Sequence, residues 1–159
     1  NELYRFDSLK KISADKVDKQ ESPVKISKNA FNTRLVTMNN LIDYIDRYRN
    51  ADFIDSLPAY HIPGVNSNSA RAFEMNDQSM SFENAGISAE DILVCDLLIK
   101  NIDRLRIEHV YVVVLKDQIY IRRLSEIKKK LKFSADHPDW QPLYIPFQDI
   151  WKYGKYPVY

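Results

Sequence analysis

Two runs of β-branched and aromatic residues, separated by Asp117 and Gln118, constrain the fold of this chain more than any other feature. Residues 109–116 read HVYVVVLK, and residues 119–124 read IYIRRL. β-branched and aromatic side chains favour strands, and two such runs joined by a short polar pair are typical of a β-hairpin. The chain is therefore expected to contain a sheet built around this hairpin.

Further strand patterns predict a mostly β domain. They lie at residues 71–75, 91–95, 131–134 and 143–147, and near residues 150–153. Short strands joined by short polar connections, with little helix between them, indicate a sheet-based architecture.

One helical region is expected before these strands. Its apolar residues recur at helical spacing on one face: Leu41, Tyr44, Ile45 and Tyr48. Asn39 or Asn40 can supply the N-cap, and Asn50 can supply the C-terminal stop. A second helical turn must end before Pro58, because proline disfavours helical geometry in the residue that precedes it.

The composition points to one domain with a tail. A chain of 159 residues that is 45% hydrophobic can fill one core. Its 23 basic and 22 acidic residues leave a net charge of +1, so nothing overall favours nucleic acid or an anionic membrane. No apolar run approaches the ~20 residues that span a bilayer. Cys95 is the single cysteine, which fits a buried core position and a reducing cytoplasm.

Residues 1–33 are predicted to form a linker or an arm ahead of a domain at residues 34–159. Lysines alternate there with aspartate and glutamate, and apolar residues are scattered. The lysines could contact phosphate groups, but a solvated mixed-charge segment is the simpler interpretation.

Several motifs keep a recognisable order along the chain. They are Asp77-Gln78-Ser79-Met80, ISAEDIL at residues 87–93, YVVV at residues 111–114, IRRL at residues 121–124 and SADHPDW at residues 134–140. In order and spacing they resemble the C-terminal domains of LexA-like and phage repressors, a family of self-cleaving serine-lysine peptidases. The resemblance covers roughly residues 36–159. It implies a LexA/signal-peptidase-like fold of short, strongly bent strands with one or two short helices near residues 40–57.

The resemblance also assigns a nucleophile and a base. The family serine lies in a Gly-Asp-Ser-Met motif and matches Ser79; the family base is a neutral lysine and matches Arg122. A guanidinium stays protonated and offers no lone pair, so Arg122 cannot accept the serine proton. Ser79 is then expected to be a relic of the nucleophile that is hydrogen-bonded to Arg122. Without the resemblance, a turn serine whose hydroxyl bonds to nearby backbone amides is the favoured interpretation.

Lys116 is a poor replacement for the missing base. If Asp117 and Gln118 form a two-residue turn, Lys116 lies opposite Ile119 and Arg122 lies opposite Val113. At ~3.3 Å per residue, Lys116 is then about 10 Å from the required position, whereas proton transfer needs about 3 Å.

The substrate segment departs from the family as well. The position at which relatives carry the cleaved Ala-Gly bond is matched by Ile42 and Asp43, which lie in a stretch with helical spacing. A peptide must be extended to enter a protease site. Asp77 and Gln78 also replace Gly-Asp, and aspartate resists backbone geometries that glycine permits. Loss of self-cleavage is therefore expected.

No metal or cofactor is implied by the sequence. The three histidines are far apart, and none has a second His or Cys at metal-ligand spacing. Aromatic residues crowd the C-terminal end, among them Trp151, Tyr153 and Tyr156. Core packing and a dimer interface both explain them.

These inferences lead to three hypotheses. The first is the regulatory and dimerisation domain of a phage-repressor-like transcription regulator that does not cleave itself. In this reading a DNA-binding helix-turn-helix domain precedes the chain, and two such domains bind one palindromic site. The second is an active peptidase that uses Ser79 and an unrecognised base. The third is an interaction module with no role in DNA binding.

Overall fold

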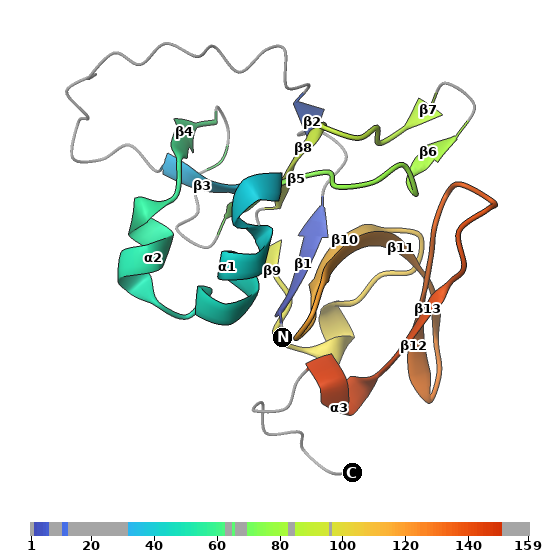
Figure 1. Cartoon of the computed structure of the whole chain (residues 1–159). Coiled ribbons are helices and arrows are strands. Elements are labelled where there is room, and N and C mark those ends of the chain that lie inside the picture. Colours follow the sequence, from blue (N-terminus) through green and yellow to red (C-terminus); the bar gives the residue numbers. More distant parts are fainter. Residues whose placement is uncertain are drawn as a thin grey trace.

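The chain folds into a mostly β domain in which two sheets pack against each other (Figure 1). The computed structural model describes residues 2–6, 11–12, 32–62, 65, 70–82, 85–95 and 97–150. The mostly β fold expected from the sequence is confirmed.

The larger sheet has six antiparallel strands in the order β13-β12-β11-β10-β1-β9. Their bounds are β1 (Glu2–Phe6), β9 (Leu97–Leu98), β10 (Val110–Val114), β11 (Ile119–Ile127), β12 (Lys130–Ser134) and β13 (Leu143–Pro146). A short 3₁₀ helix, η4 (Ile102–Arg104), lies between β9 and β10.

The second sheet has five strands in the order β2-β8-β5-β3-β4, with β3 and β5 parallel. Its strands are β2 (Lys11–Ile12), β3 (Asn32–Val36), β4 (Ala59–His61), β5 (Arg71–Glu74) and β8 (Ile92–Cys95). A small hairpin of β6 (Ser81–Phe82) and β7 (Ala85–Gly86) extends between β5 and β8. Gly86 has φ +92°, and a Cβ atom there would collide with the carbonyl oxygen of Met80. Glycine is therefore required at this position.

Strand β10 is buried on both faces and separates two parts of the core. Val110, Val112 and Val114 face the cluster that lies between the two sheets. Tyr111 and Val113 face a second cluster, which also contains Phe133 from β12. Successive side chains of a strand point to opposite faces, so an entirely apolar strand must be covered on both sides. All five residues of β10 are therefore buried, because core clusters cover both of its faces.

The predicted helical region is confirmed. It contains a 3₁₀ turn, η3 (Met38–Asn40), and two helices, α1 (Leu41–Arg47) and α2 (Ala51–Ser56). Tyr44 is completely buried, and the other three residues of the apolar face pack against the same cluster. Helix α1 ends at Arg47, before Asn50, and the side chain of Asn50 also accepts a hydrogen bond from the N–H of Phe53 and so caps the start of α2.

The β10–β11 hairpin has a longer loop than a two-residue turn. Val114 pairs with Ile119, so residues 115–118 form the connection, and the N–H of Leu115 bonds to the carbonyl of Gln118 at 3.0 Å. As a consequence, Arg122 lies opposite Tyr111 instead of Val113. Asp117 and Gln118 lack the glycine that tight hairpin turns favour.

The end of the domain also differs from the expected pattern. Strand β13 ends at Pro146, and the next four residues form a short helix, α3 (Phe147–Ile150). The strand expected near residues 150–153 is therefore wrong at Ile150, whose buried side chain packs into the second cluster. The rest of that stretch lies outside the described residues.

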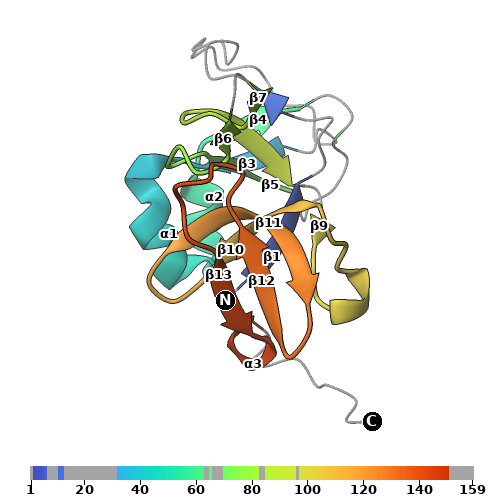
Figure 2. The same cartoon turned by 90° about the vertical axis from the view of Figure 1, so that its right-hand side faces the viewer.

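The first strand lies within the sheet, although the sequence analysis assigned residues 1–33 to a linker or an arm. Strand β1 pairs with β10 on one side and β9 on the other (Figure 2). Leu3 and Tyr4 are buried in different core clusters. The linker prediction thus fails for residues 2–6. It fails also for β2, which pairs with β8, and the other residues up to 31 lie outside the described residues.

The hydroxyl of Tyr4 joins β1 to α1. It donates to the carboxylate of Glu2 at 2.7 Å and lies 3.2 Å from the hydroxyl of Tyr44. Burial, together with the nearby Glu2 charge, raises the pKa of both tyrosines. Both hydroxyls therefore stay neutral and serve as hydrogen-bonding groups inside the domain.

Replacing Leu3 by alanine is expected to destabilise the whole domain, because Leu3 is completely buried between strands. The free energy of unfolding should fall by about 2–5 kcal/mol, the usual cost of such a truncation in a core. Urea denaturation followed by circular dichroism measures it. Ile42→Ala is the matched control, since Ile42 is 78% exposed and should change stability by less than about 1 kcal/mol. Equal effects for the two variants would contradict a structural role for β1.

Candidate functional site

Ser79 occupies the turn between β5 and β6 and is completely buried. Its N–H donates to Oδ1 of Asp77 at 2.9 Å, the short-range bond of an Asx turn. Its carbonyl accepts from the N–H of His137 at 2.9 Å. The backbone of Ser79 is thus held by its own turn and by the loop between β12 and β13.

Arg122 reaches the same point from β11. Its side chain is 3% exposed. Nη1 donates to Oγ of Ser79 and, at 2.8 Å, to the carbonyl of Ile121. The two residues that the resemblance assigned as nucleophile and base are therefore in direct contact, as suspected from the sequence.

Asp77 supplies the negative charge of the site. Its Oδ2 accepts from Nη1 and Nη2 of Arg122 at 3.5 and 3.4 Å, and its side chain is 18% exposed. A buried guanidinium is costly unless it is paired with a carboxylate. Asp77 thus meets this requirement for Arg122 and also orients the turn that carries Ser79.

Two aromatic rings flank the guanidinium. Its Cζ lies 5.2 Å from the ring centroid of Trp140 and 5.9 Å from that of Tyr120. Trp140 belongs to the β12–β13 loop, which is tied to the sheet by the bonds from Arg123 to Asp136 at 2.8 and 2.7 Å. Arginine is the cation that stacks best on aromatic faces. The loop therefore helps to confine the Arg122 side chain.

This arrangement reverses the hydrogen bonding that a serine nucleophile needs. A general base must accept the hydroxyl proton, and it must lie within hydrogen-bond reach. Here the group within reach of Ser79 Oγ is a donor. Both carboxylate oxygens of Asp77 already accept bonds, from the Ser79 amide and from Arg122. Neither neighbour is placed to activate the hydroxyl.

The remaining residues predicted for the chemistry lie elsewhere. Ile42 and Asp43 are exposed on helix α1, so the segment matched to the cleavage site is helical. Lys116 is exposed in the hairpin loop. The hydrogen bonds given for Ser79 go to Asp77, Arg122 and His137. The match of Ile42 and Asp43 to a cleavage site remains a prediction.

The dimerisation candidates Trp151, Tyr153 and Tyr156 lie outside the described residues. Within the described part of the chain, no group of three or more His, Cys, Asp or Glu side chains could hold a metal ion. Among the same residues, no helix is long and apolar enough to cross a membrane.

A comparison with known families identifies the family to which this chain belongs. The model of the family described as Peptidase S24-like matches residues 34–156. The chain belongs to this family. Searches of curated proteins and of solved structures gave no significant match.

Membership of the Peptidase S24-like family confirms the resemblance to LexA-like and phage-repressor C-terminal domains. The matched region contains Ser79, Arg122 and the loop that carries Trp140. It also contains helix α1, in which Ile42 and Asp43 lie.

The sequence analysis did not foresee the roles of Asp77 and Trp140. Asp77 was noted as a departure from the family glycine, but its bond to Arg122 depends on a strand that follows more than 40 residues later. A local signal was present, because an aspartate two residues before Ser79 is typical of an Asx turn. No comparable signal places Trp140 beside Arg122, since this contact depends on how the β12–β13 loop folds back.

Removing the Asp77 carboxylate should destabilise the domain by leaving a buried cation unpaired. Asp77→Ala is expected to lower the free energy of unfolding by about 3–5 kcal/mol. Adding Arg122→Met should recover most of this loss, because the unpaired charge is then gone. Urea denaturation of both variants tests the pair, with Asp139→Ala as an exposed control. A double variant as unstable as Asp77→Ala would show that the charge is not the cause.

Proposed function

We propose that this chain is the regulatory and dimerisation domain of a phage-repressor-like transcription regulator, and that it does not cleave itself. The observation that carries this proposal is the hydrogen bond from Arg122 to Oγ of Ser79. A donor occupies the position at which relatives use a lysine base, so the family geometry is retained without its proton acceptor.

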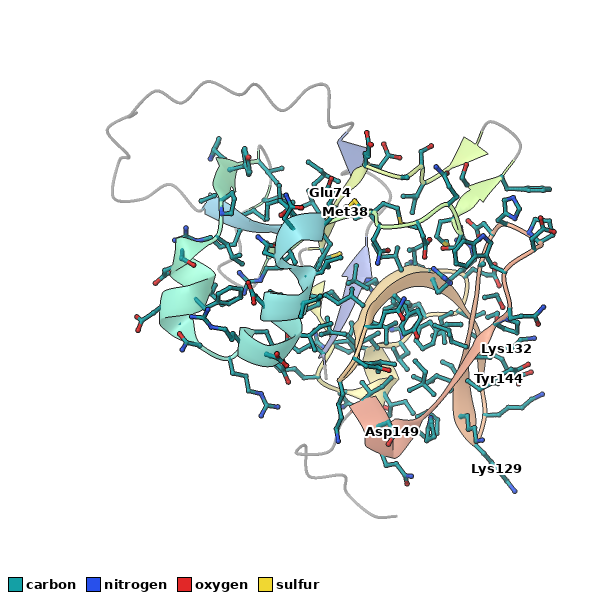
Figure 3. The ribbon with its side chains drawn as sticks, in the orientation of Figure 1. Met38, Glu74, Lys129, Lys132, Tyr144 and Asp149 are labelled. Carbon is teal, nitrogen blue, oxygen red and sulfur yellow. The ribbon has the colours of Figure 1, made fainter. Side chains whose placement is uncertain are left out.

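The helical segment at Ile42 and Asp43 supports the same proposal. A scissile peptide must lie extended in a protease site. Helix α1 is instead held on the core by Tyr44, whose buried hydroxyl contacts Tyr4 and Glu2. In the 3₁₀ turn η3, directly before this helix, the N–H of Met38 bonds to the carboxylate of Glu74 on β5 at 2.8 Å (Figure 3). Extending this segment would break these contacts.

The purified chain is expected to keep its intact mass for days at neutral pH and at about pH 9, where a partly neutral lysine base would begin to act. Mass spectrometry of the parent beside Ser79→Ala provides the measurement. Fragments from the parent that Ser79→Ala does not produce would show a working peptidase and would overturn the proposed loss of self-cleavage.

Dimerisation is proposed at the β13 end of the larger sheet. β13 is the terminal strand in the order of that sheet, and its Tyr144 is 56% exposed. Lys132 of β12 lies 5.9 Å from the centre of the Tyr144 ring (Figure 3). An edge strand with an exposed aromatic residue favours pairing with a second chain. The aromatic residues Trp151, Tyr153 and Tyr156 follow directly in the sequence.

Light scattering of the purified chain is expected to give the mass of a dimer, and Trp151→Asp or Tyr144→Asp should shift it toward a monomer, because a charge would replace an interfacial ring. Ile42→Asp is the control, since Ile42 is also exposed but lies on helix α1, away from β13 (Figure 1). A monomeric parent, or a dimer unaffected by both variants, would contradict this interface.

DNA binding is proposed to come from a helix-turn-helix domain that precedes this chain in the full-length protein. Pairing two such chains would present two reading domains to one palindromic site. If the full-length protein carries no DNA-binding domain, the proposal reduces to an interaction module that binds another protein.

A further inference from the structure

Asp77 contacts both groups on which serine chemistry at this site would depend. One carboxylate oxygen accepts from the N–H of Ser79, and the other accepts from the guanidinium of Arg122. The sequence departs from the family motif at both ends of this contact, since Asp77 replaces glycine and Arg122 replaces lysine. The two residues that differ from the family motif, Asp77 and Arg122, are thus in direct contact.

The contact with the Ser79 amide affects the transition state. In acyl transfer by a serine, the N–H of the nucleophile is a common donor to the developing oxyanion. In this chain that N–H is already bonded to a carboxylate at 2.9 Å. An incoming carbonyl oxygen would lose this donor, whose removal typically costs about 10²–10³ in kcat. It would also meet a negative charge.

The contact with residue 122 affects any base placed there. An opposite charge within about 4–6 Å favours the charged form of a lysine. A lysine at position 122, close to the Asp77 carboxylate, would be held protonated and could not accept the Ser79 proton. Restoring the family lysine alone therefore leaves the site without a base.

We infer that Asp77 is a second, independent block on Ser79, and that Asp77 and Arg122 form a coupled pair in which neither change can be reversed alone. This inference rests on the proposed function, because it explains how the site is kept silent. Arginine at 122 needs a carboxylate neighbour in order to be buried. The same carboxylate excludes a working lysine.

The coupling can be tested with a fluorophosphonate probe, which needs no substrate segment from this chain. In labelling, a bond forms between Ser79 Oγ and phosphorus, the phosphorus–fluorine bond breaks, fluoride leaves, and the hydroxyl proton passes to the base. The variants are Arg122→Lys, Asp77→Gly and the combined Asp77→Gly/Arg122→Lys. Adding Ser79→Ala to each of them gives the background labelling that does not depend on Ser79. Intact mass gives the labelled fraction over time, and thermal unfolding shows that each variant is folded.

Of Arg122→Lys, Asp77→Gly and their combination, the combined variant alone is expected to label above background. Its rate should exceed that of Arg122→Lys by about tenfold or more, because it gains both a neutral base and an oxyanion donor. The rate should rise with pH as the new lysine loses its proton, a profile that a purely structural role of Asp77 would not produce.

Asp77→Asn combined with Arg122→Lys separates the two effects. Asparagine keeps an oxygen for the Ser79 amide but removes the charge, so this variant should label at an intermediate rate. It also provides a folded variant if Asp77→Gly loses the turn, because asparagine maintains an Asx turn.

The outcomes distinguish this inference from the proposed function. Labelling of Ser79 in the parent chain would overturn the proposed loss of activity. Arg122→Lys labelling as fast as the double variants would leave the proposed function intact but would show that Asp77 is not a block. Folded double variants that stay at background would also overturn the inference, because something other than this pair would then silence Ser79.

Discussion

The structure depends on strand β10 being covered on both faces. Its five apolar residues require one layer of side chains between the two sheets and another beneath the larger sheet. β1 on one side and β11 on the other complete its hydrogen bonding. Because β11 is held along this central strand, the position of Arg122 is determined by the core and not by a mobile surface loop.

A buried cation at this position then dictates what surrounds it. The guanidinium of Arg122 needs acceptors and a negative charge, and it finds them in Ser79, Ile121 and Asp77. The rings of Trp140 and Tyr120 lie near it, with centroids 5.2 and 5.9 Å from Cζ. A site that uses a neutral lysine as base favours the opposite arrangement, because a carboxylate beside the lysine would stabilise its protonated form. The family scaffold is thus retained while its electrostatics favour a permanent charge.

Sequence patterns predicted those parts of the fold that local spacing controls. The helical face at Tyr44, the strands around Phe73 and Leu93, and the hairpin were all foreseen, because period-3.6 and period-2 patterns record which side is buried. The patterns failed where the structure depends on pairing between strands that are far apart in the sequence. Residues 2–6 read ELYRF, without the regular alternation of apolar and polar side chains that identifies a strand, yet Leu3 and Tyr4 are buried once β10 and β9 flank them.

The sequence by itself determined the chemical identity of the side chains at this site: a serine, which carries a hydroxyl, and an arginine, which cannot act as a base. Only the tertiary structure decided that the two touch, that Asp77 joins them, and that Trp140 confines the guanidinium. The physical reason is that side-chain chemistry is a property of single residues. Charge compensation and hydrogen-bond direction depend on atoms that the fold brings together from turns and strands far apart in the chain.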